Sequence, residues 1–189
     1  IVSLGGCSAS FVSAEGLIVT NNHCVQAALQ FNSTPDRNLL VDGFIARKRE
    51  DELSNGPGSR VSVVTQVLEV TDDLKRKLNA TLTDRKRYDV VDVWTKERTA
   101  ACEKDGSRCR VASFFGGLRW FEIKQLEIRD VRLVYAPAKG IGNFGGETDN
   151  WRWPRHTGDF SFYRAYVGPD GKAAPYSKDN VPYRPKRWL

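Results

Sequence analysis

The start of the chain constrains the fold most, because it reads as a β-hairpin with a cysteine near each end. Two β-prone segments, SLGGCSASFV and GLIVT, flank the turn-forming sequence SAEG. If Val12 or Ser13 pairs with about Leu17, the numbers of paired residues sum to about 30, and Cys7 lies opposite roughly His23, one residue from Cys24 and within bridging distance. The hairpin therefore supports a disulfide between these two cysteines.

The remaining two cysteines, Cys102 and Cys109, form a second local pair. Neither pair has the C-x-x-C spacing typical of zinc or redox sites. Two disulfides fit the spacing better, and they indicate an oxidising compartment such as a periplasm or the cell exterior.

Strand patterns recur on both sides of a charged central region. RVSVVTQVLEV, RVASFF, LRWFEIKQL, EIRDVRLVYA and FSFYRAYV are rich in β-branched and aromatic residues, with breaks expected at residues 116–117 and near Gln125. Residues 71–104 instead carry leucines at four-residue spacing, with Thr71 and Thr83 as candidate N-caps. We expect a mainly β sandwich or barrel with a helical insertion at about 71–104.

Composition excludes some functional classes. The 189 residues, 40% hydrophobic, suffice for a domain with a substantial core, and no apolar run reaches the roughly 18 residues of a membrane span. The net charge of +6 comes from dispersed basic residues, many beside acids as in RKRED, which argues against nucleic-acid binding. Because methionine and a signal peptide are both missing and the chain stops at KRWL, we expect a piece of a longer precursor.

His23, one of two histidines, has three possible interpretations. It is a structural residue, a metal ligand beside Cys7 and Cys24, or a catalytic base at the end of a strand. A base needs a carboxylate to hold its ring, and Asp159, which precedes the strand FSFYRAYV, is the candidate. The metal interpretation is weaker, because adjacent His and Cys rarely reach one tetrahedral ion. The other histidine, His156, is expected to be a hydrogen-bonding loop residue.

Three motifs carry a resemblance to a known family. GGCSASFVSAEGLIVTNNHC resembles the hairpin that holds the catalytic histidine in chymotrypsin-like peptidases. Together, GGCSASFVS, TNNHC and GNFGGETDNWRWPRHTGDFSFYRAYV resemble the S46 family of bacterial dipeptidyl-peptidases over almost the whole chain. The resemblance implies a serine exopeptidase that releases dipeptides from the free N-terminus of peptides, without a cofactor or metal.

The resemblance also assigns roles to residues. Residues 1–189 would form the first, N-terminal barrel of a chymotrypsin-like double β-barrel. His23 and Asp159 match the catalytic histidine and aspartate, and Asn150 and Trp151 match positions that hold the substrate's α-amino group. Trp153 is expected in the core. The implied partners are peptide substrates, a second barrel and a capping helical domain of the same peptidase, and a second copy in a homodimer.

The sequence departs from the family pattern in three places. Asn22 stands where a histidine is usual, and Glu147 where an aspartate is usual. The family's serine motif, similar to GNSGSP, is missing, so the chain alone is expected to be inactive. The candidate serines in the first hairpin and the last strand lack the glycine-lined turn of an oxyanion hole; they are Ser3, Ser8, Ser10, Ser13 and Ser161.

Two alternative functions remain from the sequence. One is a non-catalytic module on a trypsin-like barrel that binds peptide N-termini, and the other is an endopeptidase. The amine-binding role implied for Asn150 argues against the endopeptidase, which must leave room for upstream residues. The sequence does not predict which penultimate residue, hydrophobic or acidic, is preferred.

Overall fold

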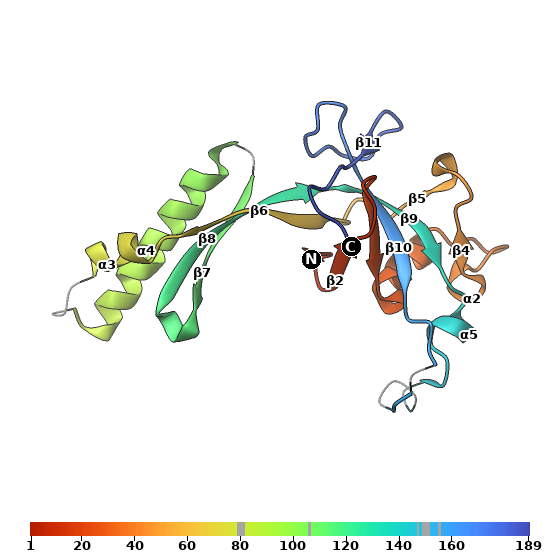
Figure 1. Cartoon of the computed structure of the whole chain (residues 1–189), viewed down its shortest axis with the longest axis horizontal. Coiled ribbons are helices and arrows are strands. Elements are labelled where there is room, and N and C mark those ends of the chain that lie inside the picture. The colour runs from red at the N-terminus through yellow and green to blue at the C-terminus, as the bar shows by residue number, and fades with distance from the viewer. Residues whose placement is uncertain (79–81, 106, 147, 149–151, 155) are drawn as a thin grey trace. The chain divides into compact units, whose positions relative to one another are not determined.

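A computed structural model describes residues 1–78, 82–105, 107–146, 148, 152–154 and 156–189. The chain divides into two compact units (Figure 1). We call residues 1–62 and 128–189 the β unit, and residues 63–127 the helical unit. Calling the protein mainly β is confirmed, because antiparallel strands dominate and helices are few. In the described part of the chain, no helix has the length and apolar character needed to cross a membrane.

The β unit is an antiparallel sheet whose strands follow the order β4-β9-β10-β3-β2-β1, with β5 added to β9 and β11 added to β10. These strands are β1 (Val2–Ser3), β2 (Ser8–Phe11), β3 (Leu17–Thr20), β4 (Phe44–Ile45), β5 (Leu53–Ser54), β9 (Asp130–Ala136), β10 (Ser161–Val167) and β11 (Val181–Pro182). A barrel requires its first and last strands to pair. Among the described residues β4 and β1 do not pair, so this sheet is open and no closed barrel forms.

The short helices of the β unit lie in the connections. They are η1 (Asn22–Val25), α1 (Gln26–Phe31), α2 (Leu39–Asp42), η2 (Arg49–Asp51) and α5 (Lys139–Gly142). The helical turns expected from His23 to about Phe31 are confirmed as η1 and α1. The sequence missed α5, β4 and β5, which have two to four residues each. Segments this short contain too little periodicity to be recognised.

The core of the β unit centres on the paired strands β3, β9 and β10. Ile18, Leu133 and Ala165 are fully buried, and Tyr163 is 1% exposed. Charged residues are buried with them: Asp130 accepts from the Arg132 guanidinium at 2.9 and 2.7 Å. Buried charges of this kind are tolerated only when they are paired and hydrogen-bonded.

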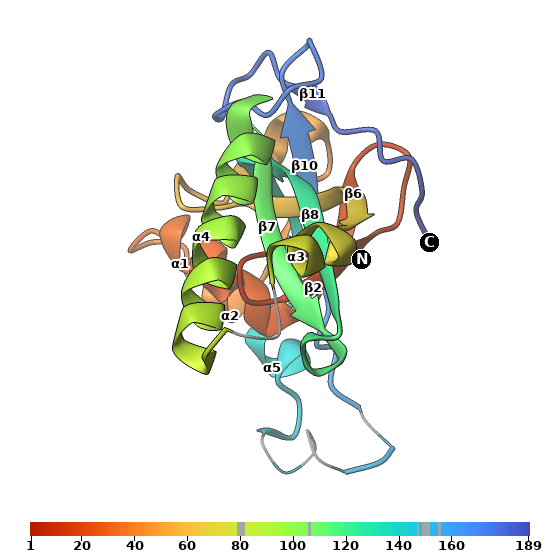
Figure 2. The same cartoon turned by 90° about the vertical axis from the view of Figure 1, so that its left-hand side faces the viewer.

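The helical unit packs two helices against a three-stranded sheet. Its elements are β6 (Val61–Glu69), which starts in the β unit, α3 (Thr71–Lys77), α4 (Asp84–Cys102), η3 (Glu103–Asp105), β7 (Arg108–Phe114), η4 (Phe115–Gly117) and β8 (Arg119–Ile128). Figure 2 shows α4 lying along β7. Val70, Leu74 and Trp94 form the buried cluster, and Trp94 meets the Trp120 ring edge-on at 6.0 Å. The helical insertion predicted at about 71–104 therefore consists of two helices, α3 and α4.

Three sequence predictions in these regions are wrong. Thr83 caps α4, but the Thr71 hydroxyl lies inside α3, where it accepts from the Trp120 N–H and donates to Glu69. The strand break expected near Gln125 falls instead at Arg129, because β8 continues to Ile128. Trp153 is 86% exposed and not part of the core.

Candidate active site

Strand pairing explains why residues far apart in sequence meet. β3 and β10 are antiparallel, with Thr20 opposite Ser161. The end of β3 therefore lies beside the beginning of β10. His23 follows β3 in η1, and Asp159 precedes β10 by two residues, so the register brings together side chains 136 positions apart.

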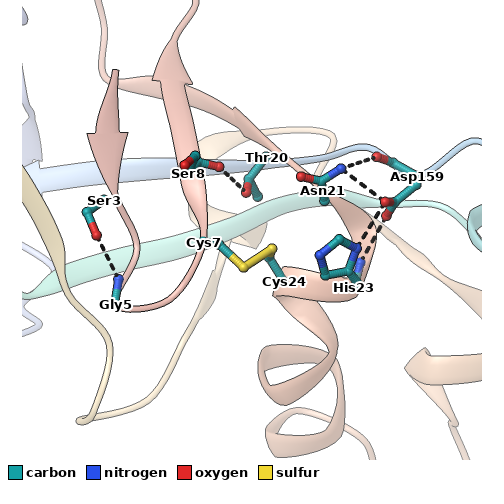
Figure 3. Close-up of a disulfide and its surroundings, with 9 residues drawn as sticks. All are labelled: Ser3, Gly5, Cys7, Ser8, Thr20, Asn21, His23, Cys24 and Asp159. Carbon is teal, nitrogen blue, oxygen red and sulfur yellow. Dashed lines mark hydrogen bonds and ion pairs between the residues drawn. A yellow bond between two sulfur atoms is a disulfide. The ribbon is translucent and has the colours of Figure 1, made fainter.

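The N-terminal hairpin and its disulfide also constrain the position of His23. Ser10 pairs with Val19 and Phe11 with Ile18, which confirms the predicted hairpin. The numbers of paired residues sum to 29, one less than the expected value of about 30. The predicted disulfide between the hairpin ends is present, with an S–S distance of 1.99 Å and a Cα–Cα distance of 6.2 Å (Figure 3). It joins Cys7 to the residue directly after His23.

His23 and Asp159 make two hydrogen bonds. The His23 Nδ1 lies 2.9 Å from Asp159 Oδ2, and the His23 backbone N–H donates to Asp159 Oδ1 at 3.1 Å (Figure 3). The Nδ1 distance is within the 2.6–3.2 Å expected of a base and the group that orients it. The His23 side chain is 63% exposed, so its remaining ring nitrogen is accessible, whereas the Asp159 side chain is 25% exposed.

Hydrogen bonds keep the Asp159 carboxyl ionised. Burial raises its pKa, but hydrogen bonds from the His23 backbone, the His23 ring and the Asn21 side chain outweigh burial, so the pKa is lowered. An ionised carboxylate only accepts hydrogen bonds. In neutral His23 the ring proton must therefore lie on Nδ1, which leaves the Nε2 lone pair free to accept a proton.

The disulfide argues against the metal interpretation of His23. Ligand atoms of Cys7, His23 and Cys24 do lie within 4.8 Å of one another. However, both sulfurs are consumed in a disulfide, and metal binding by cysteine requires a thiolate. The other predicted disulfide, Cys102–Cys109, lies in the helical unit with a Cα–Cα distance of 6.1 Å.

A cleft of about 380 Å³ opens beside the pair, lined by Asn22, His23, Gln26, Gly142, Asn143, Gly146, Thr157 and Asp159. The loop between α5 and Asp159 is fastened at its base, because Thr157 Oγ1 donates to the Gly142 carbonyl at 3.0 Å. A Cβ at Gly142 would lie 2.6 Å from Asn22 Oδ1, so a larger residue there would require the Asn22 side chain to move. Asn22 lines the cleft and donates to Ser161 Oγ at 3.3 Å, so its side chain does not face the carboxylate.

The serine hydroxyls that the structure describes do not complete a triad. None lies within hydrogen-bonding distance of the His23 ring among the described residues. Ser161, the serine nearest to Asp159 in sequence, is fully buried and accepts a hydrogen bond from Asn22 Nδ2 at 3.3 Å. His156 is exposed in the loop before Asp159. Asn150, Trp151 and Glu147 lie outside the described residues.

Sequence reasoning missed one contact in the site. The Asn21 side chain donates to Asp159 Oδ2 at 3.0 Å and to the Asp159 backbone carbonyl at 3.3 Å. The only signal was the doubled asparagine of TNNHC. Because the two side chains point in different directions, the sequence alone could not tell which of them faces the carboxylate.

Comparisons with known proteins find relatives that cover almost the whole chain. The family model for peptidase S46 matches residues 1–189. The Asp/Glu-specific dipeptidyl-peptidase of Shewanella putrefaciens is 48% identical over 100% of this chain and 26% of its own length. Dipeptidyl-peptidase 7 of Porphyromonas gingivalis is 42% identical over 96% of this chain and 25% of its own length.

Solved structures show the same fold. The crystal structure of Porphyromonas endodontalis DPP11 matches with a TM-score of 0.84 and 42% identity, covering 100% of this chain and 28% of that one. The same protein in complex with substrate matches with a TM-score of 0.82 and 41% identity, again over 100% of this chain and 28% of that one. This chain thus spans about a quarter of the length of the relatives it matches. The chain belongs to the peptidase S46 family.

Proposed function

We propose that the protein is a serine-type dipeptidyl-peptidase that releases dipeptides from the free N-terminus of peptides. In this proposal His23 is the general base and Asp159 is the carboxylate that orients it. The nucleophilic serine and its oxyanion hole come from sequence that the relatives contain beyond the quarter matched here. A histidine–aspartate pair without its serine retains only slight catalysis, so these 189 residues alone are inactive.

One observation carries the proposal: His23 Nδ1 lies 2.9 Å from Asp159 Oδ2 across 136 residues of sequence. The His23 backbone N–H donates to the other carboxylate oxygen at 3.1 Å, so His23 contacts both oxygens of Asp159. The names of the relatives supply the reaction, since they are dipeptidyl-peptidases. A base of this kind removes the proton from a serine hydroxyl and later gives it to the leaving amine.

The exopeptidase character rests on the loop before Asp159. We assign Asn150 and Trp151 to the substrate's α-amino group, where a side-chain oxygen and a backbone carbonyl would accept from an ammonium. Such acceptors would also block peptides that extend further upstream. DPP11 has been solved with the dipeptide Arg-Glu, which supports peptide binding by this fold.

The proposal extends to location and partners. Two disulfides within 189 residues favour the periplasm or the cell exterior over the reducing cytoplasm. The partners are peptides with a free N-terminus and the rest of the same peptidase, comprising a second barrel with the serine and a helical domain. A second copy of the full-length protein completes a homodimer.

The test uses the full-length protein that carries this chain. Released dipeptides are measured by mass spectrometry from matched peptides with free and acetylated N-termini, with acidic and with hydrophobic penultimate residues. Asp159→Asn keeps the shape but loses the charge, and we expect kcat to fall roughly 10⁴-fold, the effect of this change in a Ser-His-Asp triad. Asp92→Asn, the same change at an exposed carboxylate of α4, is the matched control and should leave kcat unchanged.

The outcomes separate the competing functions. Dipeptides from free but not acetylated peptides, lost in Asp159→Asn and retained in Asp92→Asn, support the proposal. Internal cleavage of acetylated peptides would indicate an endopeptidase instead. Binding of free N-termini without cleavage would indicate the non-catalytic module.

A further inference from the structure

Asn21 makes both of its recorded side-chain contacts with a single residue, Asp159. Its Nδ2 donates to Oδ2 at 3.0 Å and to the backbone carbonyl at 3.3 Å (Figure 3). One amide group therefore links the carboxylate to its own backbone. Rotation of the carboxylate away from His23 would break the bond from Asn21 as well as the bond from His23.

The helix-capping geometry shows that this contact is specific to the site. Asn21 occupies the N-cap position of η1, where an asparagine side chain usually accepts from a backbone N–H of its own helix. Here the side chain makes no capping hydrogen bond and is turned towards Asp159. Asn38, the N-cap of α2, behaves in the usual way and accepts from the Leu40 N–H at 3.1 Å.

The neighbouring asparagine has a different role. Asn22 is 6% exposed and bonds Ser161 inside the β unit, so it contributes to packing. Asn21 is exposed, and its substitution removes little buried surface. A change at Asn21 should therefore act on the carboxylate more than on the fold.

We infer that Asn21 is a positioning residue of the site, whose amide fixes the Asp159 carboxylate in the orientation that receives Nδ1–H of His23. The role in catalysis rests on the proposed function, but the clamp itself does not. Asn21 acts through Asp159 and does not touch the reacting atoms. Among the described residues, His23 is the ionisable side chain that contacts this carboxylate.

The electrostatics agree with the geometry. The hydrogen bond from Asn21 is one of the interactions that lower the Asp159 pKa against the opposing effect of burial. A donor to the charged form favours that form. Removing the donor should therefore move the Asp159 titration upward, and it should loosen the carboxylate that selects the Nδ1–H tautomer.

The first experiment uses NMR on the full-length protein that carries this chain and needs no activity. Carboxyl ¹³C signals follow the Asp159 titration and imidazole ¹⁵N signals report the His23 tautomer, each assigned by its loss in Asp159→Asn or His23→Gln. Asn21→Ala should raise the Asp159 pKa by about 0.5 to 1 unit and reduce the Nδ1–H population. Asn21→Asp, which keeps the shape, should raise it further, because adjacent carboxylates resist joint ionisation. Asn38→Ala should lower stability but change neither signal.

The second experiment measures dipeptide release by the full-length protein. Asn21→Ala should lower kcat roughly 10- to 100-fold with KM nearly unchanged, as expected when a catalytic group is misplaced. Asn38→Ala should leave kcat unchanged. A general structural role would instead lower the folded fraction and leave the Asp159 titration where it was.

The two experiments fail in different ways. If neither Asn21→Ala nor Asn21→Asp moves the Asp159 titration or the His23 tautomer, the inference is overturned, whatever the activity. If the signals move but kcat in Asn21→Ala equals that of the wild type, the clamp exists and its catalytic role is overturned. If the signals move and the full-length protein releases no dipeptides, the clamp stands and the proposed function fails.

Discussion

The two units of this protein contain ion pairs that differ in burial and in sequence separation. In the β unit, Glu52 is buried and binds Arg164 Nε at 2.8 Å and the Tyr166 hydroxyl at 2.7 Å, across more than 110 residues of sequence. The helical unit contains exposed ion pairs within a single helix, such as Lys96 with Asp92 at 2.8 Å, four residues apart. The first kind joins distant strands, whereas the second kind follows a single helix.

This difference indicates where the chain tolerates change. A buried charge that loses its partner stays desolvated, which is strongly destabilising, whereas an exposed ion pair contributes little. The pair His23–Asp159 depends on β3 and β10, whose neighbours carry the buried charges. We therefore expect the candidate site to depend on the β unit's buried network and to be insensitive to the helix charges.

The largest effect is expected for Glu52→Ala. It leaves Arg164, whose side chain is 13% exposed, without its carboxylate, and breaking such a buried pair costs about 3–5 kcal/mol. Urea unfolding measures the loss, and amide exchange should place it in β9 and β10 with α4 unchanged. A cost below about 1 kcal/mol would mean that water solvates Arg164 and that the contrast between the units is wrong.

The two disulfides should rank by the loops they close. Replacing Cys7 and Cys24 by alanine, which frees a separation of 17 residues, should cost about 3 kcal/mol. Replacing Cys102 and Cys109, separated by 7 residues, should cost about 2.5 kcal/mol. Unfolding of the two double variants under oxidising conditions measures both. Only the variant without Cys7 and Cys24 should broaden the His23 NMR signals. Broadening in the variant without Cys102 and Cys109 alone would show that the Cys7–Cys24 disulfide does not position His23.

As the pH falls, one carboxylate in each unit should be protonated only below its ordinary pKa. The Asp159 pKa lies below 3.8, so its stabilisation is complete above that pH and is lost as the pH falls through the lowered value. In the helical unit, hydrogen bonds from Arg119 and Thr71 lower the pKa of Glu69 to about 2, with loss near that pH. Carboxyl ¹³C titrations check both. A midpoint for Asp159 at or above 3.8 would show that burial outweighs its hydrogen bonds.

The smallest effect is expected for Asp92→Ala. It removes an i,i+4 ion pair with Lys96 whose side chains are 40% and 75% exposed, and such exposed pairs contribute little to stability. The change in urea midpoint should shrink further as salt screens the pair. A loss of several kcal/mol would indicate that this surface is covered in the protein and that its charges are not simply solvated.

Much of the site was predictable because its signals are local. The β-hairpin turn, the cysteine spacing and the strand beginning after Asp159 are each encoded within about twenty residues. The start of α4 was predictable from Thr83 as N-cap, whereas of the leucines at four-residue spacing only Leu74 lies inside a helix, α3. The prediction of Thr71 as an N-cap was wrong, because its hydroxyl accepts a hydrogen bond from the neighbouring strand β8. The prediction of Trp153 as a core residue was wrong, because composition does not distinguish a buried from an exposed aromatic residue.

Residue type and motif were enough to identify the candidate residues His23 and Asp159 and the paired cysteines. The structure was needed to show that Asn21, and not Asn22, faces the carboxylate. Sequence does not reveal this, because the direction of consecutive side chains depends on the backbone turn from β3 into η1. The antiparallel register of β3 with β10 then sets which distant atoms each side chain meets.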